Sequence, residues 1–220
     1  MGNTVTKIFL KSILAAIFLV ISSGTQAGMP DEHHSHEHKK DTPAPAHCDD
    51  PSIGAKDKLE ELRPLAANGD ASAQYALGFM YDRGLGVRQD YKEAASWYRK
   101  AAEQGNASAQ FHIGQMCDIG NGVPQSYEEA ASWYREAAEQ GEALAQLYLG
   151  FLYDHGQGVP VDTMQAYKWY SLAAAAGNEI APKNKTITEA RMTPNEIKEA
   201  QVLVDEWLAQ HKVMHSTMKH

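Results

Sequence analysis

Small, aromatic and glycine residues recur along the middle of the chain at a spacing of 36 residues. The sequence EAASWYR at 93–99 returns unchanged at 129–135, and a variant, QAYKWYS, stands at 165–171. Glycines keep the same register, with one series at Gly69, Gly105, Gly141 and Gly177. A period of this length is typical of stacked helical units that share one continuous core. The pattern therefore predicts an all-α solenoid built from three full repeats, at 69–104, 105–140 and 141–176.

Each repeat contains two segments with helical spacing of apolar residues, joined by a Gly-x-Gly-Val loop. We call the first segment of each repeat the A helix and the second the B helix. Side chains that can accept from free backbone N–H groups precede the B helices, and glycines that can end a helix follow them. The A helices are expected at 71–82, 107–118 and 143–154, and the B helices at 90–103, 126–139 and 162–175, with Asp90, Ser126 and Asp162 as N-caps.

Both ends of the repeat array have sequences that suggest helical caps. The segment 55–68 aligns with a B helix, although Pro64 is expected to kink or break it. The segment 177–210 begins with a variant A helix and continues with Thr193-Pro-Asn-Glu196, the pattern of a capping box. We expect the tail at 211–220 to be flexible.

The repeated motifs resemble the Sel-one-like repeat (SLR) family, which is related to the tetratricopeptide repeats. The resemblance implies a right-handed α/α superhelix that serves as a scaffold for protein contacts, and members in bacterial envelopes are known as adaptors. It supplies no shared catalytic residues. A cysteine-rich branch has been linked to β-lactam binding, but its members carry a cysteine pair in each repeat that this chain lacks. The motifs are Ala-Gln-x-x-Leu-Gly at 73–78, Tyr81-x-x-Gly-x-Gly-Val87, and Ala94-x-x-Trp-Tyr98 with Ala101, Ala102 and Gly105.

The amino terminus has the pattern of a secretory signal peptide over 1–27. Lys7 and Lys11 precede an apolar run at 12–22, and Ala27 is a suitable cleavage point. The run is shorter than the roughly 20 residues that a membrane anchor requires, so no membrane span is expected after cleavage. Export to the periplasm, or secretion, follows as the expected location.

The segment 28–54 is expected to be a disordered linker, because it has no apolar period and is rich in proline and histidine. Imidazoles suit zinc, copper and nickel, so weak binding of one of these metals is one hypothesis, and a solvated polar tether is the other. No other cofactor is indicated. The candidate metal ligands are His33, His34, His36 and His38.

Charge and cysteine content narrow the function further. The net charge of -8 argues against a nucleic-acid partner. The only cysteines are Cys48 and Cys117, which is too few for a disulfide-dense scaffold. Cys117 occupies the position held by Tyr81 and Tyr153 in the other repeats, so burial is expected; a disulfide with Cys48 is the alternative.

Residues that vary between repeats while sharing one stripe of the A helices form a candidate surface for a protein or peptide partner. Large aromatic side chains on such a surface are common anchors of interfaces, although they can also pack against neighbouring helices. The candidate partner-binding residues are Phe79, Arg83, His112, Gln115, Tyr148, Phe151 and His155.

Three functions remain open at this point. The first is an exported, non-enzymatic scaffold that binds a protein or peptide on its concave face. The second is a periplasmic protein that binds or delivers a metal through the histidine cluster. The third is an envelope β-lactam-binding or hydrolase-type protein, which is disfavoured because Gly-x-Ser-x-Gly and His-Glu-x-x-His are both absent from the sequence.

Overall fold

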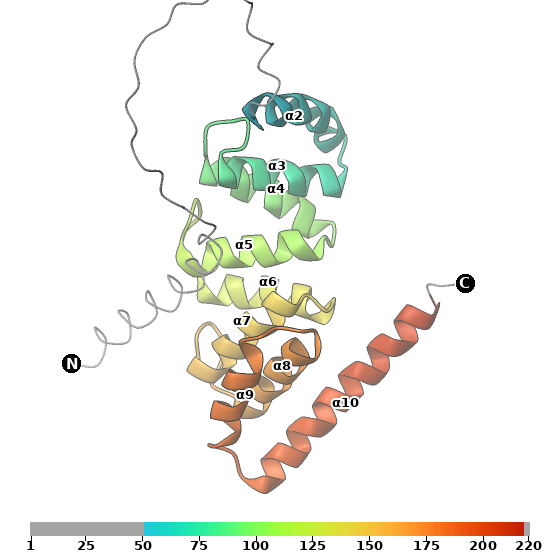
Figure 1. The fold of residues 1–220 in the computed structure, drawn as a ribbon. Coiled ribbons are helices and arrows are strands. Elements are labelled where there is room, and N and C mark those ends of the chain that lie inside the picture. Colours follow the sequence, from blue (N-terminus) through green and yellow to red (C-terminus); the bar gives the residue numbers. More distant parts are fainter. Residues whose placement is uncertain (1–50, 218–220) are drawn as a thin grey trace, which may run out of the picture. The chain divides into compact units, whose positions relative to one another are not determined.

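A computed structural model describes residues 51–217, with side chains described over 54–211. This part of the chain contains helices and no strands (Figure 1). The signal segment, the histidine cluster and Cys48 lie outside it. The helices are α2 (Pro51–Ala67), α3 (Ala71–Arg83), α4 (Tyr91–Glu103), α5 (Ala107–Ile119), α6 (Tyr127–Glu139), α7 (Ala143–His155), α8 (Thr163–Ala175), α9 (Ala181–Glu189) and α10 (Pro194–Thr217).

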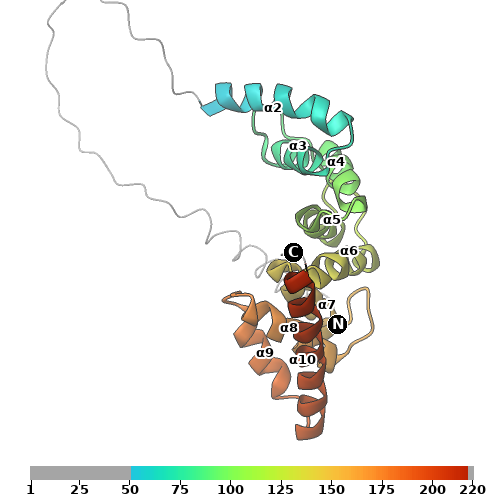
Figure 2. The same cartoon turned by 90° about the vertical axis from the view of Figure 1, so that its right-hand side faces the viewer.

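The predicted all-α solenoid is confirmed. Helices α3, α5 and α7 are the A helices, and α4, α6 and α8 are the B helices. Each A helix ends one residue later than predicted, and each B helix begins one residue later. In Figure 2 the described helices form a curved stack, with α3 and α5 on its inner side and α4 and α6 on its outer side. The A helices therefore line the concave side.

The junctions between units are closed by backbone and side-chain hydrogen bonds. At the end of α4, the Gly105 N–H donates to Ala102 O at 2.9 Å and the Asn106 N–H donates to Ala101 O at 3.1 Å. These two bonds form a Schellman motif. Asn106 then begins the next helix, because its side-chain oxygen accepts from the Ala109 N–H at 2.9 Å. Two adjacent residues thus end one helix and start the next.

Within each unit, a tyrosine of the B helix fills the space left by a glycine of the A helix. Tyr134 is fully buried, and a Cβ added to Gly114 would lie 2.9 Å from its ring. The same pairing joins Gly78 to Tyr98 and Gly150 to Tyr170. Because a larger side chain has no room here, the small residue sets the distance between the two helices.

Between units, the second glycine of each loop packs on the start of the preceding B helix. A Cβ added to Gly158 would lie 2.2 Å from the backbone of Tyr127, and one added to Gly122 would lie 2.2 Å from the backbone of Tyr91. Gly86 packs in the same way on the backbone of Ala55. Helix α2 therefore takes the place of a B helix in front of the first unit, as its sequence predicted.

A repeated series of glutamine hydrogen bonds, which we call the glutamine chain, also links successive units. The Gln74 amide donates to Ala66 O at 3.1 Å, and its own Oε1 accepts from Gln104 at 2.7 Å. In the next unit, Gln110 Oε1 accepts from Gln140 at 2.6 Å. The third unit breaks the series because Ala176 stands where the donor would be. The buried Oε1 of Gln146 has no hydrogen-bond partner.

Replacing Ala176 with Gln should therefore stabilise the protein by about 1 kcal/mol, the typical net value of a hydrogen bond. The new amide would reach Gln146 Oε1 as Gln140 reaches Gln110. Urea unfolding of Ala176→Gln measures the effect, with Ala176→Glu as a control that offers no amide donor. Equal stability of Ala176→Gln and the wild type would contradict this account of the glutamine chain.

Three expectations about the ends of the array need correction. Helix α2 begins at Pro51, inside the segment assigned to the linker. Pro64 does not end α2, which continues to Ala67; Pro64 is exposed, and only the last turn follows it. Helix α10 continues to Thr217, beyond the expected boundary at 210.

The carboxyl-terminal helices close the array. Helix α9 packs against α8 in the place of a fourth A helix. The capping box that starts α10 is confirmed, since the Thr193 N–H donates to the Glu196 carboxylate at 2.7 Å. Helix α10 then packs against α8 (Figure 1) and reaches α6, where Trp207 Nε1 donates to Glu139 Oε2 at 2.7 Å. Within the described part of the chain, no helix is long and apolar enough to cross a membrane.

Candidate functional site

The variable stripe of the A helices forms a continuous surface, which we call the A-helix face. Its positions recur every 36 residues, and the series extends from α3, α5 and α7 into α9, which the sequence analysis had not included. All seven predicted partner-binding residues lie on it. The A-helix face consists of Phe79, Arg83, His112, Gln115, Ile119, Leu144, Tyr148, Phe151, His155, Ile180, Ile187 and Arg191.

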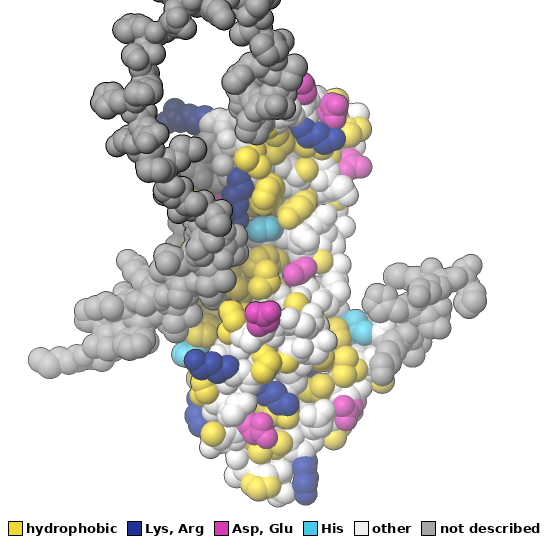
Figure 3. Space-filling model, in the orientation of Figure 1, with side chains coloured by type: hydrophobic (Ala, Val, Ile, Leu, Met, Phe, Trp, Pro, Cys, Tyr) yellow, Lys and Arg dark blue, Asp and Glu magenta, His cyan; other side chains and the backbone are white. Residues whose placement is uncertain are grey.

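Several large apolar side chains on the A-helix face are open to solvent. The exposed fractions are 45% for Ile119, 41% for Leu144, 41% for Ile180 and 53% for Ile187. Single exposed apolar residues are common on protein surfaces. Here Leu144 and Ile180 share one register position and Ile119 and Ile187 occupy two others, and Figure 3 shows hydrophobic side chains running down this side of the stack. Contiguous apolar surface of this kind marks interaction sites.

The aromatic residues predicted to anchor a partner are more buried than side chains that are fully available for binding. Phe79, Tyr148 and Phe151 are only partly exposed and pack against the hydrophobic core. They form the floor of the A-helix face, because part of each ring is covered by the core. The exposed aliphatic residues, and not these rings, offer the most accessible apolar contacts.

Two aromatic residues that the sequence analysis missed complete this floor. Tyr75 lies against His112 with ring centroids 5.8 Å apart, and Phe111 lies against Tyr148 at the same distance. Each pair joins residues 37 positions apart on adjacent A helices. A search for aromatic residues at the repeat length plus one would have found both.

His112 is held as a neutral imidazole by its surroundings. Its ring stacks on Tyr98 with centroids 5.0 Å apart, and its Nε2 lies 3.5 Å from the Tyr75 hydroxyl. Burial, assisted by the nearby Arg83 guanidinium, lowers the pKa of His112 to about 4. The polar edge of this imidazole therefore contributes to the A-helix face without charge.

A row of basic groups stands at the carboxyl ends of the A helices. The Arg83 guanidinium lies 5.6 Å from the centre of the Phe79 ring. His155 stacks on Phe151 with centroids 4.0 Å apart. Arg191 occupies the same register position in the last unit and pairs with Asp154. Basic groups are favoured at helix carboxyl ends by the helix dipole.

Gln115 lies between these features in the second unit. It is partly exposed. Burial, with the nearby Asp118 carboxylate, raises the pKa of Tyr148, and the Gln115 side chain opposes this rise. Gln115 therefore adds a polar side chain to the A-helix face.

Cys117 is fully buried, as predicted. Burial is the main cause that raises the pKa of its thiol to about 11, so the thiol stays protonated and unreactive at neutral pH. Its neighbour Glu129 forms an ion pair with Arg99 at 2.7 Å. The alternative disulfide involves Cys48, which lies outside the described residues.

The metal hypothesis concerns residues outside the described part of the chain, namely His33, His34, His36 and His38. Among the described residues, no group of three or more His, Cys, Asp or Glu side chains could hold a metal ion. His112 and His155 point to different aromatic neighbours, Tyr98 and Phe151. The structure therefore does not bring these two histidines together as ligands.

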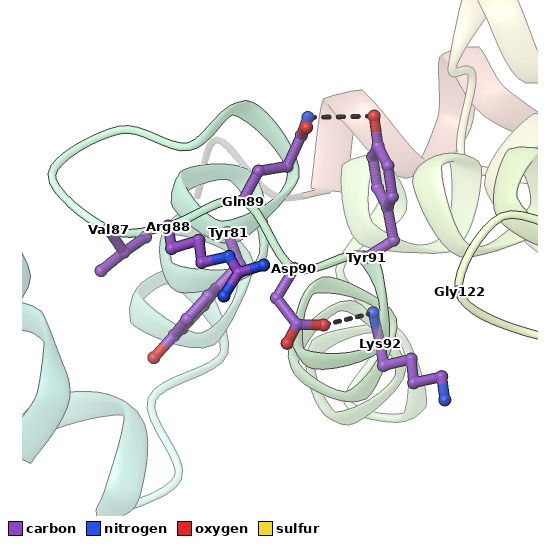
Figure 4. A pocket seen from close by; sticks show the side chains of 8 residues that line it. All are labelled: Tyr81, Val87, Arg88, Gln89, Asp90, Tyr91, Lys92 and Gly122. Carbon is purple, nitrogen blue, oxygen red and sulfur yellow. Dashed lines mark hydrogen bonds between the residues drawn. The ribbon is translucent and has the colours of Figure 1, made fainter.

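A separate pocket of about 700 Å³ lies at the loop between α3 and α4 (Figure 4). Two of the polar side chains that line it, Gln89 and Asp90, are used by the loop itself. Gln89 donates to Asp82 O at 2.6 Å, and Asp90 accepts from the Lys92 N–H at 2.9 Å as the N-cap of α4. The pocket is thus a product of the Gly-x-Gly turn, and its hydrogen bonds stabilise that turn.

Comparison with protein families identifies Sel1 repeats at residues 71–106, 107–142 and 143–178. These bounds begin two residues after those predicted from the sequence. No curated protein matches the chain.

Solved structures with similar folds are themselves repeat proteins of this type. The crystal structure of c5321, a protective antigen of uropathogenic Escherichia coli strains with an SLR fold, matches 69% of this chain and 40% of that chain, at 30% identity and a TM-score of 0.54. A Sel1 repeat protein from Oxalobacter formigenes matches 62% of this chain and 58% of that chain, at 34% identity and a TM-score of 0.55. The chain thus spans only part of either relative. The chain has three consecutive repeats that match the family model, and each folds into a pair of helices. It therefore belongs to the Sel1-like repeat (SLR) proteins.

Proposed function

We propose that this protein is an exported, non-enzymatic scaffold that binds a protein or peptide on its concave A-helix face. Sel1 repeats generally mediate protein–protein interaction. The observation that carries the proposal is that Ile119, Leu144, Ile180 and Ile187 are all exposed on the A-helix face, at three register positions in successive units. Export is supported by the signal-like pattern at 1–27.

The arrangement of the A-helix face suits recognition of a chain that crosses several units. Its aromatic floor is fixed by stacking, as shown by Tyr134 and Tyr148 with centroids 5.4 Å apart. A rigid floor limits the conformational entropy that the protein loses on binding. Exposed aliphatic groups above the floor supply area that a partner can remove from water.

Metal binding or delivery through the histidine cluster is a second candidate. It is favoured by one observation in the sequence, four histidines within residues 33–38. In this case the segment 28–54 binds the metal, and the solenoid serves as its support. The test of the first proposal therefore includes a chelator.

Changing Ile119, Leu144 and Ile187 together to Gln should reduce partner capture from envelope extract at least about tenfold, because interface residues of this kind each contribute about 1 kcal/mol. Gln keeps a good helix propensity, and the three side chains are exposed, so the variant should still unfold cooperatively. The measurement compares captured proteins by mass spectrometry on immobilised chains without residues 1–27.

The matched control carries the same change at exposed apolar residues away from the A-helix face, Leu65, Leu85 and Val202. The control should capture the partner as the wild type does, with or without chelator. Equal loss in both variants, or no loss in the first, would contradict the proposed surface. Loss caused only by the chelator would transfer the function to the histidine cluster.

A further inference from the structure

We propose that the partner segment recognised by the A-helix face is acidic as well as apolar, with Asp or Glu side chains that pair with the basic row at the carboxyl ends of the A helices. This inference rests on the proposed function and specifies the chemistry of the partner.

The basic row occupies one register position in four successive units. The residues at that position are Arg83, Ile119, His155 and Arg191. The three basic side chains are open to solvent, with exposed fractions of 46% for Arg83, 41% for His155 and 47% for Arg191. Three of the four units therefore place a basic side chain, two arginines and one histidine, along the same edge.

The carboxylates nearest to this row pair with it but are more buried than their partners. Asp82 lies 3.4 Å from Arg83, and Asp154 pairs with Arg191 and lies 4.0 Å from His155. The exposed fractions of the carboxylate side chains are 19% for Asp82 and 10% for Asp154. The more exposed member of each pair along this edge is therefore basic, although the whole chain carries a net charge of -8. Local charge of the opposite sign favours an anionic partner and orients it during approach.

Each basic group has an apolar group one helical turn before it. Arg83 follows Phe79, His155 follows Phe151, and Arg191 follows Ile187. The first two pairs are in contact, with the Arg83 guanidinium over the Phe79 ring and the His155 ring on Phe151. A segment that presents an apolar side chain beside a carboxylate satisfies both members of such a pair.

The opposite edge of the A-helix face has a different character. The equivalent positions near the amino ends of the A helices are Ser72, Ser108, Leu144 and Ile180, and none is basic. The N-cap residue of α7 is Glu142, whose side chain makes no capping hydrogen bond. The A-helix face therefore has basic side chains along its carboxyl edge and none along its amino edge. This difference favours one orientation of a bound acidic segment. Figure 3 shows Lys and Arg side chains beside the hydrophobic band on this side of the stack.

The experiment selects a phage-displayed library of random 12-residue peptides on the purified chain without residues 1–27. We expect the selected peptides to be enriched in Asp or Glu together with aliphatic or aromatic residues. Synthetic copies are then measured by fluorescence anisotropy. Binding should weaken as NaCl rises from about 50 to 500 mM, because salt screens exposed charge pairs.

A double-mutant cycle isolates the charge contribution. Arg83→Gln should weaken binding about threefold to fivefold, the range of an exposed ion pair, whereas Arg83→Glu should weaken it about tenfold through repulsion. A peptide whose carboxylate is replaced by the amide should bind the wild type more weakly than the acidic peptide does. Its affinity should not fall further when the protein carries Arg83→Gln. Arg63→Gln is the matched control, since Arg63 is 52% exposed on α2; it should leave binding unchanged.

Two results would overturn the inference in different ways. Selected peptides without excess acid, whose binding requires Ile119, Leu144 and Ile187 but is unchanged by Arg83→Gln, would reject an acidic partner and leave the proposed function standing. Peptide binding that is unaffected by every substitution on the A-helix face would reject both.

Discussion

Replacing Gly158 with Ala should destabilise the protein by about 3 to 4 kcal/mol, whereas the same change at Gly105 should cost about 1 kcal/mol. Both glycines have positive φ, +68° at Gly158 and +86° at Gly105, so both substitutions carry the cost of a left-handed conformation for Ala. A Cβ at Gly105 meets nothing within 4 Å, but one at Gly158 would lie 2.2 Å from the Tyr127 backbone. Forcing these backbones apart adds an overpacking cost of about 1 to 3 kcal/mol.

Urea unfolding of the two variants measures this difference, with circular dichroism as the readout. The comparison tests whether the loop glycine packs on the preceding B helix, because the conformational cost is shared and cancels. Similar losses at Gly158 and Gly105 would contradict the close stacking of units. Gly122→Ala provides a second test at the equivalent contact with Tyr91.

Acidification from pH 7 to pH 4 should lower the free energy of unfolding of the wild type by about 3 kcal/mol more than that of His112→Tyr. The pKa of His112 falls from 6.5 to about 4 on folding because of burial. The unfolded state therefore binds a proton at higher pH than the folded state. This stability is fully present above pH 6.5 and is lost as the pH falls towards 4, at about 1.4 kcal/mol per unit of pKa shift.

His112→Tyr is the matched variant because Tyr148 occupies the same position in the next unit and stacks on Tyr134. Asp118 acts in the opposite direction, since burial raises its pKa from 3.8 to about 6. The contribution of Asp118 to stability is lost as the pH rises from 3.8 to 6. Because the wild type and His112→Tyr share this contribution, it cancels when their free energies of unfolding are subtracted. Superimposable pH profiles for wild type and His112→Tyr would contradict a neutral, buried His112.

The sequence predicted those parts of the fold that depend on residues close together in the chain. Asp90 and Asp162 cap their helices as expected, and the repeated glycines end the B helices, because capping and turn formation are local. The 36-residue register also predicted which residues share the A-helix face, since helical spacing alone places Phe79 and Arg83 on one stripe.

Features that depend on contacts between distant residues were not predicted. Trp207 and Glu139 are separated by 68 positions, and no repeat links them, so the packing of α10 against the array had no signal in the register. The repeat pattern also weakens after Gly177, which concealed the contribution of Ile187 and Arg191 from α9. The depth of Phe79 and Tyr148 depends on how closely adjacent helices approach, which spacing within one helix does not determine.

The most direct test of the central claim places a photo-crosslinking benzoylphenylalanine at position 119 on the A-helix face, and separately at position 202 on α10. Both native residues, Ile119 and Val202, are exposed apolar side chains, so neither substitution should disturb the core. Irradiation in envelope extract should crosslink a partner protein to the chain at position 119. No partner should be crosslinked at position 202. A partner crosslinked at position 202 and absent at position 119 would contradict the A-helix face as the binding surface.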